Sequence, residues 1–441
     1  MASTAAETSD EAAPSAAWNR KRRYVIAIGL LVIVTLGYMD RVNFSVAGPN
    51  IIDEFGLSVG EFGVVTSLFN WAYVLCLIPV GMMADRWGAK VILPVGIVVW
   101  SLGAGLTGAA TGLAVLVAAR LILGAGESTA YPVGNLVVRE WAPSKERGVF
   151  TGMLNAGALV GPAVGAVVAG YLIVGIGWRE SFFILGGAGA LIGLGWGLIY
   201  NSPEKAKWLS DEERDMILHQ REASSEKAQE SSSTRMSVRR LLRTKTVWGL
   251  MLTQGCAVYT SYLFLSFLPL FLVTQRGLDI LGSGLVTGLT YGVAAVGSVI
   301  VAFVSDRRLK SSEVQSGGRR KAVVATLLAG LPLLALPWVT DTVLVIALVS
   351  WVLIMITAAI TLNFALAGDL TRDRSSAGVV FALVTVGGNV FGLLAPIVTG
   401  YLVDWTGSYT APFLIAGSLL FVGAVASWTM CTHVLQPKIA V

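Results

Sequence analysis

Four charged residues lie in segments that are otherwise apolar enough for a membrane. Arg120 and Glu127 fall within the glycine-rich stretch ARLILGAGESTAYP, and Asp40 and Arg41 fall within GYMDRVNFS. A charge near the centre of a membrane helix costs at least about 2.5 to 3.5 kcal/mol, and such residues usually face a partner or a water-filled cavity. We therefore predict that these four side chains form the functional centre of a membrane transporter.

Their spacing predicts how the four side chains are arranged. Arg120 and Glu127 are seven residues apart, so on the single helix that we expect here they share a face about 10 Å apart along the axis. Asp40 and Arg41 are neighbours and diverge by about 100°, so they cannot point at one target. We expect a network between the two segments rather than two isolated pairs.

The chemistry of this set is that of a proton-dependent anion site. With both carboxyls ionised the four charges cancel, whereas protonation of Asp40 and Glu127 leaves two arginines that attract an anion and suit a carboxylate. Proton binding would then prepare the anion site, and release of both on the inner side would let the empty carrier relax. A purely structural role for the ion pairs is the alternative.

The composition supports a membrane protein with many spans. The 441 residues are 55% apolar and only 13% charged, and they include 50 glycines, whereas soluble proteins have about 25% charged residues. The three cysteines lack metal-ligand spacing and only two histidines are present, so we expect no metal site, no bound cofactor and no enzyme activity. The net charge of +5 reflects membrane topology, and we expect no nucleic-acid partner.

Hydropathy divides the chain into two sets of six spans. We expect a disordered cytoplasmic tail (1–23), an N-terminal six-helix bundle (24–200), a cytoplasmic linker (201–246), a C-terminal six-helix bundle (247–432) and a second cytoplasmic tail (433–441). The predicted spans are 24–48, 62–83, 91–110, 112–138, 148–173, 180–200, 247–273, 282–305, 321–338, 342–367, 376–402 and 410–432. In the linker, Ser210 and Glu213 have capping-box spacing and predict a short surface helix.

The basic residues predict that both termini are cytoplasmic. With alternating topology only Arg179 and Arg276 fall in external loops, and only Arg41 and Arg120 lie within spans; all other Lys and Arg are cytoplasmic. The halves also repeat: residues 169–191 align with 399–421, both containing Gly-Tyr-Leu. Parallel repeats of this kind are typical of transporters.

Two short motifs at the cytoplasmic ends of spans resemble the major facilitator superfamily. GMMADRWGAK (81–90) resembles its loop motif after the second span, and Ser-Asp-Arg at 305–307 resembles the degenerate copy in the second half. An Asp at a helix end can cap a neighbouring helix and pair with Arg. The resemblance implies a gating latch, which comprises Asp85, Arg86, Lys90, Asp306 and Arg307.

Within that superfamily the chain resembles the anion:cation symporter family. The similarity rests on YMDRVNFSVAGP, SLFNWAYVLCLIPVGMMADRWG and RLILGAGESTAYP, and members include proton-coupled galactonate, glucarate and hexuronate transporters and vesicular glutamate and sialic acid carriers. The resemblance implies an all-α membrane protein with twelve spans in two pseudo-repeats. It also implies roles for individual residues: Asp40 and Glu127 as the protonatable pair, Arg41 as the contact to the substrate carboxylate, Arg120 as the counter-charge to Glu127, and Gln254 and Asn389 as contacts to sugar hydroxyls.

The second half has no charged residue in the middle of a span, which suggests that it binds the neutral part of the substrate. Amides suit a polyhydroxylated tail, whereas the tyrosines, Tyr73 and Tyr259 among the candidate cavity walls, also suit an aromatic one. The prediction is a proton-coupled symporter that imports a sugar acid, with protons as the coupling ion, working as a monomer in a bacterial inner membrane. Aromatic or small dicarboxylic acids, or proton-driven export of organic anions, are the alternatives.

Overall fold

The structure is a computed structural model that describes residues 22–230, 236–309, 317–372 and 374–435. Within these residues, twelve helical segments are long and apolar enough to cross a membrane, which confirms the predicted number of spans. The fold is therefore an all-α membrane bundle.

The helices follow the predicted spans closely. The first half contains α1 (Tyr24–Val46), α2 (Gly48–Phe55), α3 (Val59–Trp87), α4 (Ala89–Gly108), α5 (Leu113–Glu127), α6 (Ala130–Trp141), α7 (Arg147–Ile176) and α8 (Trp178–Ile199). The linker carries α9 (Asp211–Glu230) and α10 (Val238–Leu241). The second half contains α11 (Lys245–Arg276), α12 (Ile280–Arg308), α14 (Arg320–Ala329), the 3₁₀ helix η3 (Leu331–Trp338), α15 (Thr342–Leu370), α16 (Arg374–Thr406) and α17 (Thr410–Met430).

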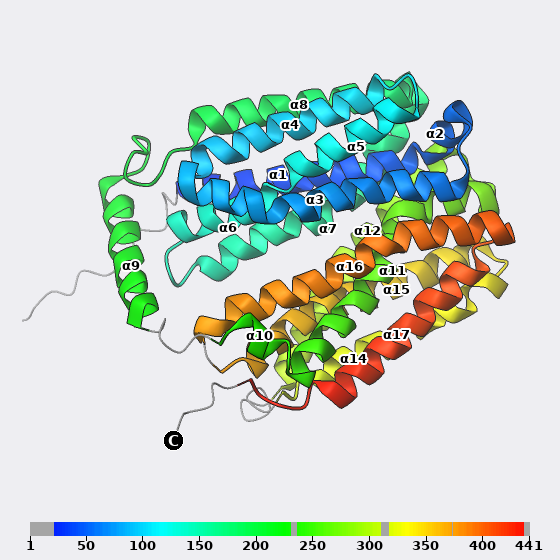
Figure 1. The fold of residues 1–441 in the computed structure, drawn as a ribbon. Helices are drawn as coiled ribbons and strands as arrows, with labels where there is room; N and C mark the ends of the chain where they lie inside the picture. The colour runs from blue at the N-terminus through cyan, green and yellow to red at the C-terminus, as the bar shows by residue number, and fades with distance from the viewer. Residues whose placement is uncertain (1–21, 231–235, 310–316, 373, 436–441) are drawn as a thin grey trace, which may run out of the picture.

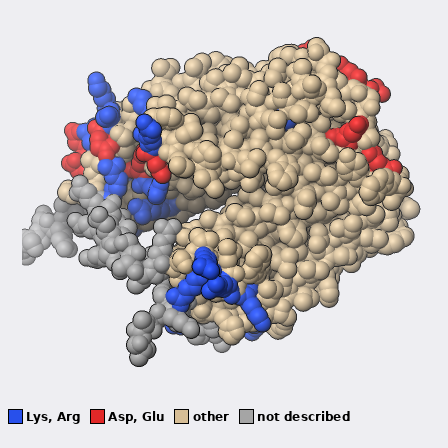
Figure 2. Space-filling model, in the orientation of Figure 1, with Lys and Arg blue, Asp and Glu red and all other residues tan. Residues whose placement is uncertain are grey.

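The two sets of spans form two bundles that meet at one end and separate at the other (Figure 1). Figure 2 shows a cleft between them that opens at the end where Lys and Arg gather. At the opposite end α3 and α16 are in close contact, since a Cβ on Gly63 would lie 2.3 Å from the Pro396 carbonyl oxygen. The positive-inside rule predicts that the open end is the cytoplasmic one.

Glycines on α7 bring it close to the helix that carries Asp40 and Arg41. A Cβ on Gly161 would lie 2.4 Å from Tyr38 Cβ, and one on Gly165 would lie 2.7 Å from Met39 Cα. Only glycine permits this backbone approach, as expected at interfaces of small residues between membrane helices. Helix α7 thus fixes the position of α1 at the level of its charged residues.

The stretch from Ala119 to Pro132 differs from the prediction of one continuous helix. Helix α5 ends at Glu127 and α6 begins at Ala130. Pro132 lacks the N–H that would bond to the Ser128 carbonyl, and the hydroxyls of Ser128 and Thr129 donate to the Ala125 and Gly126 carbonyls at 2.6 and 2.8 Å. The helical hydrogen-bond pattern is therefore interrupted directly after Glu127, although Leu113–Trp141 remains one membrane span and Ser128 and Thr129 keep helical dihedrals.

The cytoplasmic tail predicted for 1–23 also needs correction. Residues 1–21 lie outside the described residues, but the Arg23 side chain is buried; its guanidinium donates to both oxygens of Glu146 at 2.8 Å and pairs with Glu213. The predicted linker helix is present as α9, and Ser210 Oγ accepts from the Glu213 N–H at 3.3 Å. Arg23 thus ties the linker to the first bundle. Of the second predicted tail, 433–441, residues 436–441 lie outside the described part.

Candidate functional site

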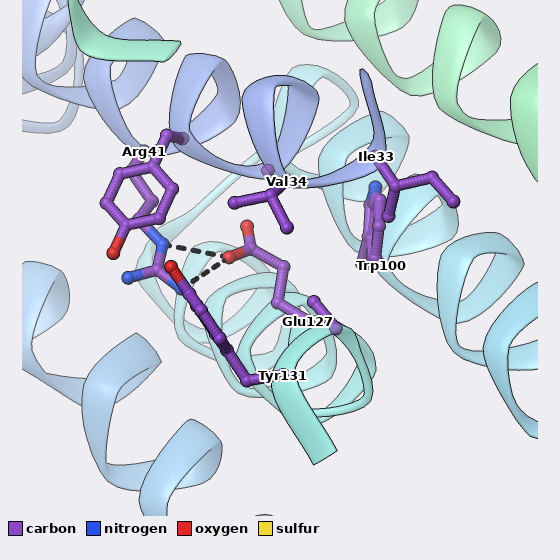
Figure 3. A pocket seen from close by; sticks show the side chains of 9 residues that line it. Ile33, Val34, Arg41, Trp100, Glu127 and Tyr131 are labelled. Carbon is purple, nitrogen blue, oxygen red and sulfur yellow. Dashed lines mark hydrogen bonds and ion pairs between the residues drawn. The ribbon is translucent and has the colours of Figure 1, made fainter. Parts of the chain in front are cut away.

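The centre of the site is a buried ion pair between α1 and α5. Arg41 Nε and Nη2 each lie 2.8 Å from Glu127 Oε2, and both side chains are more than nine-tenths buried. Figure 3 shows the two side chains pointing toward one another, with Tyr131 directed at their contact. The direct partner of Glu127 is therefore Arg41, while Arg120 is an electrostatic neighbour of Glu127 without a hydrogen bond to it.

Aromatic rings surround both arginines. The Arg41 Cζ atom lies 4.5 Å from the Tyr38 ring centroid, 4.7 Å from that of Phe69 and 5.0 Å from that of Tyr73. Rings at this distance attract a cation and shield it from water. The structure thus places the predicted Tyr73 against Arg41, where it holds the guanidinium in place.

Arg120 occupies a separate aromatic slot. Its Cζ lies 4.1 Å from the Phe44 ring centroid and 5.0 Å from that of Phe69, and the residue is 2% exposed. Its Nε and Nη1 have no hydrogen-bond partner among the described residues. Phe69 is shared by the two arginines, so it holds both cations at one level of the bundle.

Asp40 is fully buried, and neither of its carboxyl oxygens has a hydrogen-bond partner among the residues that the structure describes. Its electrostatic neighbours are Glu127, Arg120 and Arg41. All four charges predicted from the sequence therefore lie in one network, although only Arg41 and Glu127 are in direct contact. A buried carboxylate without hydrogen bonds is costly as an anion, which suits a group that takes up and releases a proton.

A small cavity lies beside the ion pair. It has a volume of about 10 Å³ and its walls include Ile33, Val34, Trp100, Glu127 and Tyr131, most of which appear in Figure 3. One water molecule needs roughly this space. Trp100 was not predicted from the sequence, because a tryptophan in an apolar span is usually a packing residue.

In the second half the predicted amides lie on α11 and α16. Gln254 is 2% exposed and its Oε1 accepts from Asn363 Nδ2 at 2.9 Å. A Cβ on Gly388 would lie 3.2 Å from Gln254 Cγ, so Gln254 packs against the stretch of α16 that contains Asn389. The predicted Tyr259 is buried on α11, whereas Tyr262, one turn further along α11, is an electrostatic neighbour of Arg41, as Tyr38 and Tyr73 are.

The predicted latch residues lie at the end of each half that the positive-inside rule predicts to be cytoplasmic. Arg319 pairs with Asp306 and, at 2.8 Å, with Asp369, so Asp306 is held within its own bundle. Lys90 Nζ donates to Asn201 Oδ1 at 2.6 Å.

The other latch side chains lie against aromatic rings or at the surface. Arg86 lies over the Trp87 ring and Arg307 over the Phe303 ring. Asp85 is exposed.

At the outer end, a carboxylate of the second half caps a helix of the first. Asp404 Oδ1 and Oδ2 accept from the backbone N–H groups of Val59 and Gly60 at 2.9 and 2.8 Å. Further along the same two helices, Ser67 Oγ on α3 donates to the Leu393 carbonyl on α16 at 2.6 Å. Sequence reasoning did not find Asp404, because its partners are backbone atoms of a distant segment.

A polar contact within the first half lies on the same side of the membrane. The hydrogen bond from Arg179 to Glu54, at 2.6 Å, lowers the pKa of that carboxyl. The outer end is therefore held by exposed charges as well as by close helix packing.

Comparison with known proteins gives a matching family and several relatives. The family model described as Major Facilitator Superfamily matches residues 30–378. Relatives include a probable sulfoacetate transporter of Cupriavidus necator, 32% identical over 92% of this chain and 93% of that protein, and a probable L-galactonate transporter of Escherichia coli, 29% identical over 90% of this chain and 86% of that protein. A hexuronate transporter of Bacillus subtilis is 28% identical over 92% of this chain and 94% of its own.

A solved structure shares the fold. It is the crystal structure of a bacterial homolog of the human lysosomal transporter Spinster in an inward-facing, unoccupied conformation, which aligns with a TM-score of 0.73 and 19% identity over 95% of this chain and all of that one. At this identity the match supports the architecture alone. The relatives named above carry the information about transport.

Proposed function

This chain belongs to the major facilitator superfamily, and we propose that it is a proton-coupled symporter that imports a hexonate or hexuronate sugar acid by alternating access. The transporter class, the twelve-span fold and the likeness to sugar-acid carriers are confirmed by the family match and the relatives. Proton coupling, the substrate and the direction of transport are the proposal.

The observation that carries the proposal is the contact between Arg41 and Glu127. Both Arg41 nitrogens that face Glu127 bond to the same carboxyl oxygen, so the guanidinium edge suited to a substrate carboxylate is occupied by the protein's own carboxyl. A neutral Glu127 holds Arg41 much less strongly than an ionised one. Protonation of Glu127 would therefore release Arg41 for the substrate, and loss of the proton would displace the substrate again.

Asp40 provides a second protonatable group in the same network. Because it lies close to Glu127 and to both arginines, the charge on Asp40 alters the net charge that an entering anion meets. With both carboxyls neutral, Arg41 and Arg120 attract an anion strongly. The two carboxyls thus tie anion binding to protonation, which is the requirement for symport.

The cleft supports an inward-facing arrangement of this carrier. It opens at the end marked by Lys and Arg (Figure 2), where a substrate would leave for the cytoplasm. The bacterial relatives and the distribution of basic residues support the proposed placement in a bacterial inner membrane with both termini cytoplasmic. The proposed working unit is a monomer.

The relatives favour a second candidate within the same mechanism. One of them is a probable sulfoacetate transporter, and sulfoacetate is a small acid with two anionic ends. Arg120 supplies a second buried cation near Arg41, with two nitrogens unpartnered among the described residues. Import of a small dianion is therefore the alternative to import of a sugar acid.

The test is uptake into liposomes that contain the purified protein. With pH 5.5 outside and pH 7.5 inside and the membrane potential clamped, we expect radiolabelled galactonate or glucuronate to accumulate, and a protonophore to abolish accumulation. Selective accumulation of sulfoacetate would select the second candidate. No gradient-driven uptake of any organic acid would refute the symporter proposal, and accumulation in the reverse direction would identify an exporter.

A further inference from the structure

A fully buried asparagine, Asn363, fixes the orientation of the Gln254 side-chain amide. Asn363 on α15 is 0% exposed, and its Nδ2 donates both to the Leu250 backbone carbonyl at 3.1 Å and to Gln254 Oε1 at 2.9 Å. Leu250 and Gln254 lie one turn apart on α11. One nitrogen with two hydrogens therefore serves two acceptors on the same helix.

The backbone carbonyl decides the orientation of both amides. Leu250 O can only accept, so the Asn363 atom that contacts it must be the NH₂ group and not the amide oxygen. Since the same nitrogen contacts Gln254, the Gln254 atom facing it must be an acceptor, which is Oε1. Gln254 Nε2 then points away from Asn363, and it has no hydrogen-bond partner among the residues that the structure describes.

We propose that Asn363 is a positioning residue for substrate specificity, which sets Gln254 as a pure hydrogen-bond donor toward the substrate. This inference rests on the proposed function, in which the second half binds the end of the substrate remote from Arg41. A fixed NH₂ group favours an oxygen that accepts, such as a terminal carboxylate or a hydroxyl lone pair. It offers nothing to a hydroxyl hydrogen.

Asn389 provides the contrast on the neighbouring helix. It is partly exposed, and the structure shows no side chain that holds its amide in one orientation among the described residues. Such an amide can turn and meet either a donor or an acceptor. The two amides predicted from the sequence thus differ: Gln254 selects the polarity of the group that it meets, whereas Asn389 adapts to it.

The substitution Asn363→Asp reverses the polarity of Gln254 without a change of shape. The carboxyl oxygen that replaces Nδ2 carries at most one hydrogen, and the fixed Leu250 carbonyl takes it. A lone pair then faces Gln254 in either protonation state, so the glutamine turns Nε2 toward the new carboxyl group and presents Oε1 to the substrate. An acceptor now stands where a terminal carboxylate would bind.

The experiment compares two acids that differ only at the far end. Galactonate ends in a hydroxymethyl group and galactarate in a carboxylate, and each is measured as an inhibitor of labelled galactonate uptake in liposomes. For Asn363→Asp we expect the affinity ratio of galactarate to galactonate to fall roughly tenfold, because a donor to a charged group is replaced by an acceptor. Asn363→Leu, which frees the glutamine to turn, should shift the ratio in the same direction by less.

Thr253→Val is the matched control. Thr253 precedes Gln254, and its hydroxyl donates to the Gly423 carbonyl at 3.2 Å on another face of α11. Loss of this hydroxyl should therefore leave the affinity ratio of galactarate to galactonate unchanged. Active Asn363→Asp and Asn363→Leu transporters with the wild-type ratio would refute the positioning role alone. Failure of the wild-type protein to bind either acid would refute the proposed function together with this inference.

Discussion

The two bundles share a repeated fold but divide the chemistry between them. The first holds four buried charges, with Arg41 and Glu127 in contact; the second holds neutral amides, with Gln254 fixed by Asn363. Charged groups respond to protons and amides do not, so the proposed proton coupling would depend on the first bundle. Directional hydrogen bonds, which fix orientation rather than charge, belong to the second.

The same asymmetry appears at the outer ends of corresponding helices. The N-terminus of α12 is capped by the preceding Asp279, whose Oδ1 accepts from the Gly282 N–H at 2.7 Å. The N-terminus of α3 is capped by Ser58 and also by Asp404 from the other bundle. The start of α12 is thus capped within its own bundle, while the cap of α3 also joins the two halves in this conformation.

The largest expected effect comes from removal of the anion contact in the first bundle. We predict that Arg41→Ala abolishes binding of the transported acid, with a loss of at least about 100-fold in affinity, because a charge-assisted bidentate contact is lost. Thermal stabilisation of the purified protein by the acid measures this. Arg41→Lys keeps the charge but not the fork and should recover only part of the affinity; unchanged affinity in Arg41→Ala would remove this residue from the site.

Coupling is expected to depend on Glu127 separately from binding. In Glu127→Gln the side chain stays neutral, so Arg41 remains free for the substrate while no proton can be carried by this group. We predict that accumulation driven by a pH gradient is lost, whereas counterflow exchange of labelled for unlabelled acid survives. If the variant still concentrates the acid under the gradient, the coupling group is Asp40 and not Glu127.

The spans and the charged residues were predictable because each follows from a single strong energetic term. Apolar length identifies a span, and the cost of a buried charge singles out Asp40, Arg41, Arg120 and Glu127. Which charges touch was not predictable, because the Arg41–Glu127 contact depends on how α1 and α5 are placed in the bundle.

The neutral members of the site carry no comparable signal in the sequence. Trp100, Phe44 and Phe69 have the same residue types as ordinary packing residues. Asn363 and Asp404 acquire their roles only from backbone atoms of distant segments, which one sequence does not bring together. Tertiary packing therefore decides the details of the site, whereas hydropathy decides its location.

The contact across the outer end predicts a moderate shift between conformations. Asp404→Asn leaves one acceptor for the N–H groups of Val59 and Gly60 and removes the charge that favours a helix N-terminus. We expect the outward-facing fraction to rise about fivefold, which corresponds to about 1 kcal/mol.

Distance measurements between spin labels at the outer ends of α3 and α16 would report this shift. Asp279→Asn removes the charge from a helix cap that makes no inter-bundle contact, so it should leave the distance distribution unchanged. Equal effects of the two substitutions would show that Asp404 stabilises its helix and does not hold the bundles together.

The smallest effect concerns two tyrosines one turn apart on α11. Tyr262 interacts with Arg41, whereas Tyr259 is buried within the second bundle. We expect Tyr262→Phe to weaken binding of the acid about threefold, the consequence of one modest hydrogen bond, and Tyr259→Phe to leave binding unchanged. Competition assays at several pH values measure both. A larger loss of affinity in Tyr259→Phe than in Tyr262→Phe would contradict this prediction. It would mean that the acid binds within the second bundle, out of reach of Arg41.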